Sequence, residues 1–482
     1  MRWGVGYLLV LTCFQLASCQ EPRKDRPAEV LLREYFLVKL KGTRIGTYSR
    51  IIQRTPSGQI ESNISFDISV KRFNQALSVT RHLVIQENEA GQIDSFEMRL
   101  SQSADPIVIR GSRTNGNFRV TQTGAGPRVQ NTSVIPPDLL GPWKTELKQR
   151  SLGFAEGTQY RITVLNPTAI DALFESYEIK LTGKRKFVLG NQETEVAVMR
   201  ANTIPAGAEE LTFLSNEGNI LYQEVAGYSM ERSDEPTSRA NYSSSEVIDL
   251  LLVKPEGRLE NPRFRFEAEF SVTSDQGAPS IEASPYQTVK VDGKTLAVRI
   301  KVPEPTGKIT FAAQDPYVQP DFYITSKDPN IVRLARAAVG NEKDPWKQVE
   351  ILSRWVYTSV KKKDSSVGYA TASEVARDLT GDCTEHSVLF AALARSLGIP
   401  TRIVTGLVYL DSAAGSAMIF HQWVEVRFAT WIPVDPTFGL ARADAGRIVI
   451  APVSSASQAE MKRAERAIIE WCNGVRVKVI SE

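Results

Sequence analysis

Histidine and cysteine are both scarce in this sequence, which has three histidines and four cysteines. Two of the cysteines, Cys13 and Cys19, lie in the first twenty residues, so the folded chain is left with Cys383 and Cys472. A structural zinc site needs four ligands close together. His386 lies three residues after Cys383, but two further ligands for that pair are lacking, so we expect no metal site and no metal cofactor.

Excess charge and long apolar runs are also missing. The chain has 58 Lys and Arg against 55 Asp and Glu, and no basic cluster is interleaved with aromatic residues, so a nucleic-acid partner is not expected. Beyond the N-terminal segment, no stretch is long and apolar enough to span a bilayer. With 42% hydrophobic and 23% charged residues, the composition is that of a globular protein, and the length predicts roughly three domains.

The first 18 residues have the pattern of an export signal. Arg2 is followed by the apolar run 4–16, which is short for a membrane span. The sequence Leu-Ala-Ser-Cys at 16–19 resembles the lipobox of bacterial lipoproteins, which implies a lipid anchor at Cys19 and a periplasmic or cell-surface protein. Gln20 would fit outer-membrane sorting by the same resemblance. An ordinary secretory signal cleaved near Cys19 is the alternative, and either one predicts export.

The rest of the chain divides into a linker and three folded regions. Residues 19–29 are polar and contain Pro22 and Pro27, which is typical of a linker. We expect an antiparallel β domain at 30–240, a small β module at 246–325 and an α+β domain at 326–482. In the first region, alternating segments separated by turn residues predict strands at 35–40, 48–53, 64–70, 77–86, 92–100, 106–110, 117–122, 161–166, 175–181, 193–200, 209–214 and 220–225.

Helices dominate the start of the last region. The pattern at 330–339 predicts a helix ending near Gly340. Asp344 and Pro345 have the residue types of an N-cap and a first helical position, for a second helix running toward Lys361. The apolar residues of this second helix are expected to pack into the core.

One cysteine in the last region stands at a predicted helix start. Cys383 precedes an apolar run with helical spacing that ends at Gly398. The unpaired N–H groups at a helix N-terminus lower the pKa of a thiol placed there. Cys383 is therefore a candidate nucleophile. Asp382 and Glu385 are acids of a kind that the helix dipole favours, although their charges oppose thiolate formation.

A histidine and an aspartate follow on predicted strands. Segments 402–410 and 420–428 are extended and joined by a loop at 411–418, and the second places His421, Trp423 and Glu425 on one face. A short strand at 431–434 ends at Asp435. This aspartate could bind the far ring nitrogen of His421 while the near nitrogen takes the proton of Cys383.

These residues together resemble the transglutaminase-like superfamily of papain-like cysteine enzymes. The matching pieces are Gly-Asp-Cys at 381–383, Gly-Ile-Pro-Thr-Arg at 398–402, His-Gln-Trp-Val-Glu-Val at 421–426 and Trp-Ile-Pro-Val-Asp-Pro-Thr at 431–437. The resemblance covers roughly a third of the chain, from about Asp328 onward. It implies Cys383 as nucleophile, His421 as general base and acid, and Asp435 as the residue that orients the histidine.

The resemblance further implies an enzyme that acts on amide or peptide bonds of a protein or peptide through an acyl thioester. We expect hydrolysis rather than crosslinking. A non-catalytic surface protein whose β domains bind a partner is the alternative. Taken singly, Cys383 could be a core residue, His421 a strand residue and Asp435 a turn former. His386 would support the pocket and Cys472 would pack near the C-terminus, and we expect both Cys383 and Cys472 to be thiols.

Overall fold

The computed structural model describes residues 28–481 except for short internal segments. Cys19 and Cys472, for which lipidation and packing were predicted, lie outside the described residues. The internal segments that are not described are 73–74, 125–127, 168–169, 171–172, 205–208, 226, 243, 247–249, 276, 282–283, 308, 310–314, 362–368, 413–414, 454–463, 465–466, 469–470 and 472–473.

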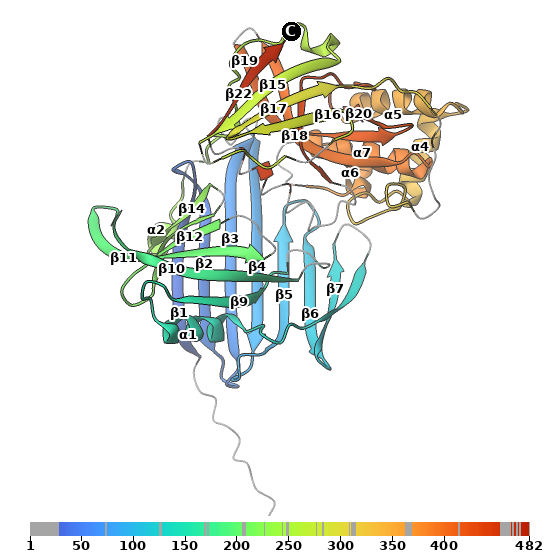
Figure 1. Ribbon diagram of the computed structural model, residues 1–482. Coiled ribbons are helices and arrows are strands. Elements are labelled where there is room, and N and C mark those ends of the chain that lie inside the picture. The colour runs from blue at the N-terminus through green and yellow to red at the C-terminus, as the bar shows by residue number, and fades with distance from the viewer. Residues whose placement is uncertain are drawn as a thin grey trace, which may run out of the picture.

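The N-terminal region is one antiparallel sheet of 14 strands (Figure 1). In the first half, each strand pairs with its neighbour in sequence, and in the second half the order runs back until β14 pairs with β1. The strands are β1 (Glu29–Leu40), β2 (Thr43–Arg54), β3 (Ile60–Arg72), β4 (Gln75–Glu87), β5 (Ile93–Ser101), β6 (Ile107–Thr114), β7 (Asn117–Thr123), β8 (Val129–Val134), β9 (Gln159–Leu165), β10 (Phe174–Leu189), β11 (Gln192–Ile204), β12 (Glu209–Leu214), β13 (Ile220–Val225) and β14 (Tyr228–Ser233).

This sheet curls so that its two ends meet. Phe174 of β10 lies 6.2 Å from Phe118 of β7, measured between ring centroids. Near the same end of the β9–β10 pair, Thr163 of β9 forms a bridge with Leu139, just before helix α1 (Pro142–Leu152). Apolar side chains from both halves are therefore enclosed together, which explains how a sheet with so many strands acquires a core. An antiparallel β domain was expected here, whereas β8 and β14 were not predicted as strands.

The C-terminal region contains two four-stranded sheets and a group of helices (Figure 1). The orders are β16-β17-β15-β22 and β20-β19-β18-β21. The strands are β15 (Glu267–Ser274), β16 (Gln287–Asp292), β17 (Thr295–Lys301), β18 (Thr401–Ser412), β19 (Gly415–Arg427), β20 (Trp431–Val434), β21 (Arg447–Val453) and β22 (Val475–Ser481), and the helices of this region are α4 (Pro329–Val339), α5 (Pro345–Ser359), α6 (Ala372–Asp378) and α7 (Cys383–Ser396). The fold class is α+β, as predicted.

Helix α7 is the centre of the C-terminal region. It packs against α4, α5 and α6 and against strands β18 and β19. Its residues from Glu385 to Arg395 are all buried, so the apolar run found in the sequence forms the core of this region. The capping residues Asp344 and Pro345 begin α5 as expected, with the Asp344 carboxylate accepting hydrogen bonds from two backbone N–H groups.

Several boundaries differ from those expected. Strand β22 pairs with β15, so the end of the chain joins the small sheet of the 246–325 module rather than the 326–482 domain. The expected loop at 411–418 is a tight hairpin, because Ser412 pairs with Gly415 and the strands extend to its tip. Helix α6 was not predicted, and a 3-10 turn at Pro262–Phe264 precedes β15. Helix α2 (Glu235–Arg239) lies at the end of the region expected at 30–240.

The three regions are in direct contact. Val253, in the segment after the N-terminal sheet, exchanges two backbone hydrogen bonds with Met418 of β19. The side chain of Gln102, after β5, donates a hydrogen bond of 3.3 Å to the hydroxyl of Tyr323. Each helix in the described part of the chain is too short or too polar to cross a membrane.

Candidate active site

Cys383 is the first residue of helix α7, as the sequence predicted, and its side chain is partly exposed. Asp382 caps this helix end by accepting hydrogen bonds of 3.0 Å from the backbone N–H and the hydroxyl of Thr384. Glu385 completes the capping box by accepting a hydrogen bond of 3.0 Å from the Asp382 N–H. The two acids that the sequence placed near the thiol therefore fix the helix start on which it sits.

The residue that leads into this helix has to be glycine. Gly381 has φ of +140°, and a Cβ at this position would lie 2.3 Å from the Cβ of Glu385. The other carboxylate oxygen of Glu385 accepts a hydrogen bond of 3.2 Å from the backbone of Ala370. The buried glutamate thus connects the start of α7 to the segment before α6, and the Gly-Asp-Cys sequence follows from this close packing.

His421 lies on β19 and is only 5% exposed. Its Nε2 is 2.9 Å from Oδ2 of Asp435, which is the hydrogen bond expected from the sequence. The imidazole is also enclosed by aromatic rings, with Phe438 at 5.3 Å and Trp423 at 6.3 Å between centroids. This hydrogen bond makes Nε2 the protonated nitrogen of the neutral ring, which leaves Nδ1 as the nitrogen that can accept a proton.

Asp435 is completely buried directly after β20. Its Oδ1 accepts hydrogen bonds from the backbone N–H groups of Thr437 and Phe438, at 3.1 and 3.4 Å. Burial by itself raises the pKa of this carboxyl group, but the positive charges and hydrogen bonds of His421 and Arg447 outweigh burial and hold the pKa well below its ordinary value. Asp435 is therefore ionised at neutral pH.

Arg447 was not identified from the sequence. It is 1% exposed at the start of β21, with one terminal nitrogen 2.8 Å from Oδ2 of Asp435 and the other 2.5 Å from Oδ1 of Asp444. Asp444 also pairs with Arg263 at 2.9 Å. Asp435, Arg447, Asp444 and Arg263 thus form a chain of ion pairs that begins at the carboxylate bound to His421. Arg447 lies twelve residues after Asp435, outside the predicted strand that ends there. The pattern of apolar residues therefore did not indicate that the two side chains would meet.

A second group of buried polar side chains adjoins the strand that carries His421. The hydroxyl of Tyr369 donates a hydrogen bond of 3.4 Å to Oε1 of Gln422, and Gln422 donates one of 3.1 Å to the hydroxyl of Thr405. Burial raises the pKa of Tyr369 well above its ordinary value, and the charges of Tyr323, Glu385 and Cys383 add to the effect. Tyr369 is therefore a neutral hydroxyl close to the cysteine.

His386 supports the site from inside the core. It is fully buried, and its Nδ1 lies 2.5 Å from the backbone oxygen of Asp382, so this nitrogen carries the proton. The ring thereby reinforces the turn before Cys383. Within the described residues, no three His, Cys, Asp or Glu side chains gather in a way that could hold a metal ion.

The structure brings His421 and Asp435 into direct contact and packs α7, which begins at Cys383, against the strand that carries His421. The catalytic roles of these three residues remain predictions. Cys383 has a thiol that is not part of a disulfide, whereas the state of Cys472 and the lipidation of Cys19 concern residues outside the described part of the chain.

Comparisons with known proteins bear on this region. An uncharacterised protein of Haemophilus influenzae is 27% identical over 147 residues, which make up 27% of this chain and 37% of that protein, so this chain matches little more than a third of its relative's length. A solved structure named "putative cysteine protease" from Cytophaga hutchinsonii aligns over 41% of this chain and 79% of its own, with 17% identity and a TM-score of 0.30. A barrel-like protein of unknown function from Brucella abortus aligns over 42% of this chain and 94% of its own, with 10% identity and a TM-score of 0.32.

The family comparison matches the site itself. Residues 332–436 fit the profile described as the transglutaminase-like superfamily, and this range contains most of α4, all of α5 to α7 and β18 to β20, and the three predicted site residues. The match agrees with the resemblance seen in the sequence motifs. Residues 332–436 thus match the core domain of the transglutaminase-like superfamily.

Proposed function

We propose that this chain is an exported cysteine enzyme that cleaves amide bonds of a protein or peptide with Cys383, His421 and Asp435 as its catalytic triad. The observation that carries the proposal is the buried His421–Asp435 hydrogen bond on the strand that packs against α7, whose first residue is a cysteine. A histidine oriented by an ionised carboxylate, on a strand packed against the helix that begins with a cysteine, suits nucleophilic catalysis by that cysteine.

In this mechanism, Nδ1 of His421 takes the proton of the Cys383 thiol, and the thiolate attacks the amide carbonyl. The imidazolium then gives that proton to the leaving amine as the C–N bond breaks, and an acyl thioester remains on Cys383. Water attacks the thioester, His421 takes one of its protons, and the carboxylic acid leaves as the thiolate forms again. Asp435 stabilises the imidazolium because its low pKa keeps it charged throughout.

Hydrolysis is proposed in preference to crosslinking, in which an amine would replace water in the last step. The proposal includes export and attachment to the membrane through a lipid on Cys19, which rests on the lipobox-like sequence at 16–19. Mass spectrometry of the membrane-extracted protein tests the anchor, which is ruled out if the mature N-terminus carries no acyl group.

The triad is tested by the pH dependence of alkylation. At pH 6, iodoacetamide should react with Cys383 at least about ten-fold faster than it reacts with the thiol of free glutathione. The reason is that a thiolate paired with His421 persists at pH values below the ordinary thiol pKa. The matched variant His421→Gln keeps the thiol and removes the base, so its alkylation rate should rise with pH as that of an ordinary thiol does. Cys383→Ala gives the background from Cys472.

Activity is measured on a library of peptide amides, with released amine as the readout. We expect cleavage by the wild type, none by Cys383→Ala, and little change in melting temperature in that variant, because the cysteine is partly exposed. An ordinary alkylation profile in the wild type, unaffected by His421→Gln, would instead show that the domain is a non-catalytic scaffold.

A further inference from the structure

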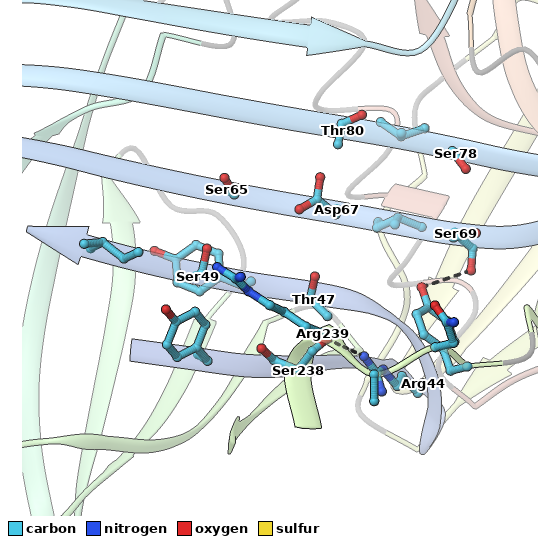
Figure 2. Close-up of a pocket in the computed structure, with 18 residues that line it drawn as sticks. Arg44, Thr47, Ser49, Ser65, Asp67, Ser69, Ser78, Thr80, Ser238 and Arg239 are labelled. Atoms are coloured by element: carbon cyan, nitrogen blue, oxygen red, sulfur yellow. Dashed lines mark hydrogen bonds between the residues drawn. The ribbon is translucent and has the colours of Figure 1, made fainter. Parts of the chain in front are cut away.

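The N-terminal sheet carries a polar cavity of about 620 Å³ that is separate from the candidate active site (Figure 2). Strands β2, β3 and β4 form its floor, and the segment 238–242, which begins at the end of helix α2, forms one wall. A volume of this size is in the range of small-molecule binding sites. None of its lining residues takes part in the site around Cys383.

The wall of the cavity is fixed to the sheet. A terminal nitrogen of Arg44 donates a hydrogen bond of 2.7 Å to the backbone oxygen of Ser238, and the guanidinium lies over the ring of Tyr242 at 4.3 Å. The Tyr242 hydroxyl donates to the backbone oxygen of Ile45 at 2.8 Å. Three residues after Tyr242, the backbone oxygen of Ser245 accepts a hydrogen bond from the backbone N–H of Lys71 in β3. The cavity is therefore bounded by two anchored elements and is preformed.

Hydroxyl groups and one carboxylate cover the floor. In the register of the sheet, Asp67 of β3 lies opposite Thr47 of β2 on one side and Thr80 of β4 on the other. Directly opposite residues of antiparallel strands present their side chains on the same face. The three side chains accordingly form a row across three strands, as Figure 2 shows, and Ser49 and Ser65 form a parallel row.

Two charged groups that line the cavity lack charged partners. Among the described residues, no Lys or Arg makes an ion pair with Asp67 and no Asp or Glu makes one with Arg44, and the Arg44 Nε–H is buried without any hydrogen-bond partner. Buried polar groups are nearly always satisfied in folded proteins. The cavity lining therefore offers a carboxylate and an arginine to a ligand that carries both hydrogen-bond donors and acceptors.

We propose that this cavity binds a neutral oligosaccharide. Each sugar hydroxyl can donate one hydrogen bond and accept others, so a row of hydroxyls could donate to Asp67, accept from Arg44 and exchange hydrogen bonds with the Ser and Thr side chains between them. An inorganic anion fits less well, because Asp67 occupies the middle of the floor and would repel it. A hydrocarbon ligand would leave the carboxylate and the hydroxyls unpaired at a loss of affinity.

The site is tested by calorimetric titration of the purified full chain with cellotetraose, maltotetraose and chitotetraose, with inorganic phosphate as the anion. We expect at least one tetrasaccharide to bind with a Kd of about 1 mM or lower, and phosphate not to bind. Asp67→Asn should weaken that binding by about ten-fold or more, because a hydrogen bond to a charged group is lost. Thr80→Val should weaken it by a few-fold.

The matched control is Thr114→Val, which changes an exposed threonine of β6 outside the cavity and should leave binding unaltered. Melting curves of all variants verify the fold. The proposal is overturned if no tetrasaccharide binds up to about 10 mM, if phosphate binds in their place, or if Asp67→Asn and Thr80→Val both bind as the wild type does. Because the cavity shares no residue with the triad, these results are independent of whether Cys383 is catalytic.

Discussion

Arg447 and His421 donate to the same oxygen of Asp435. The arginine Nη2 lies 2.8 Å and the histidine Nε2 2.9 Å from Oδ2, and the two charged side chains Arg447 and Asp435 are 1% and 0% exposed. The charge of Asp435 is therefore compensated inside the protein even while His421 is neutral. This arrangement allows a buried carboxylate to stay ionised, and it makes the position of the imidazole depend on an arginine that does not touch it.

The first prediction concerns the free energy of unfolding when Arg447 is replaced. Arg447→Met fills a similar volume but leaves Asp435 and Asp444 without their shared partner, so we expect a loss of about 3–5 kcal/mol, measured by urea unfolding at pH 7. The matched control is Arg476→Met, which breaks an exposed ion pair with Asp275 and should change stability by less than about 1 kcal/mol. Equal effects of the two substitutions would contradict this account of the buried network.

The second prediction concerns the acid stability of Asp435→Asn. The folded-state pKa of Asp435 lies well below the value of about 3.9 in an unfolded chain, so the ionised group stabilises the fold above that pH, and this contribution is lost as the pH falls toward the folded-state pKa. Below about pH 4, the wild type should lose stability more steeply than Asp435→Asn. Urea unfolding at pH 3, 4, 5 and 7 measures the difference, and parallel curves for the two proteins would refute it.

The parts of the site that the sequence predicted are those set by local chemistry. The start of α7 at Cys383 followed from an apolar run with an acid before it, and the strand end at Asp435 followed from the Pro-Thr after it. The His421–Asp435 contact was predicted from the chemistry of the two residue types and from the family resemblance. In the structure, the pairing of β19 with β20 brings these two side chains together.

Pairings between distant segments could not be predicted. Strand β22 joins β15 across some two hundred residues, and Arg447 reaches Asp435 only because β21 pairs with β18 on the far side from β19. The alternation of apolar and polar residues in β22 shows that one face of the strand is buried. It would be the same whichever strand β22 paired with, so it does not identify β15 as the partner. The polar cavity was missed for a related reason, because Thr47, Asp67 and Thr80 become neighbours only in the register of three strands.

The third prediction concerns Glu87, whose side chain is 1% exposed and accepts a hydrogen bond of 2.9 Å from the Trp143 N–H at the start of α1. Burial raises the pKa of Glu87 to about 7, against the hydrogen bonds of Trp143 and Lys144 that lower it. A raised folded-state pKa gives stability that is complete below about pH 4.3 and is lost as the pH rises through 7.

The wild type should therefore lose up to about 3 kcal/mol of stability from this group between pH 4.5 and pH 8. Glu87→Gln keeps an acceptor for Trp143 and cannot ionise, so its stability should change less over that range. Unfolding by urea at pH 4.5, 6 and 8 measures this. If the wild type and Glu87→Gln show the same pH dependence, Glu87 does not titrate near neutrality.

The fourth prediction concerns Gly406 of β18, which lies directly opposite His421 in the β18–β19 register. A Cβ at this position would meet the backbone oxygen of Ile448 at 2.0 Å and the ring of Trp423 at 2.6 Å. Its φ is not positive, so alanine would be excluded by crowding alone rather than by backbone conformation. Gly406→Ala must therefore displace β21, Trp423 or both.

Either displacement reaches the site, since Trp423 stacks on His421 and β21 carries Arg447. We expect Gly406→Ala to lower the free energy of unfolding by about 1–3 kcal/mol, as overpacked cores do. The alkylation rate of Cys383 at pH 6 should fall with it, because the imidazole is no longer held by Asp435 in its productive orientation. A second substitution that shortens the crowding side chain, Trp423→Phe, should recover part of both losses. A Gly406→Ala variant with wild-type stability and wild-type alkylation would show that the contact between the glycine and the tryptophan does not position the histidine.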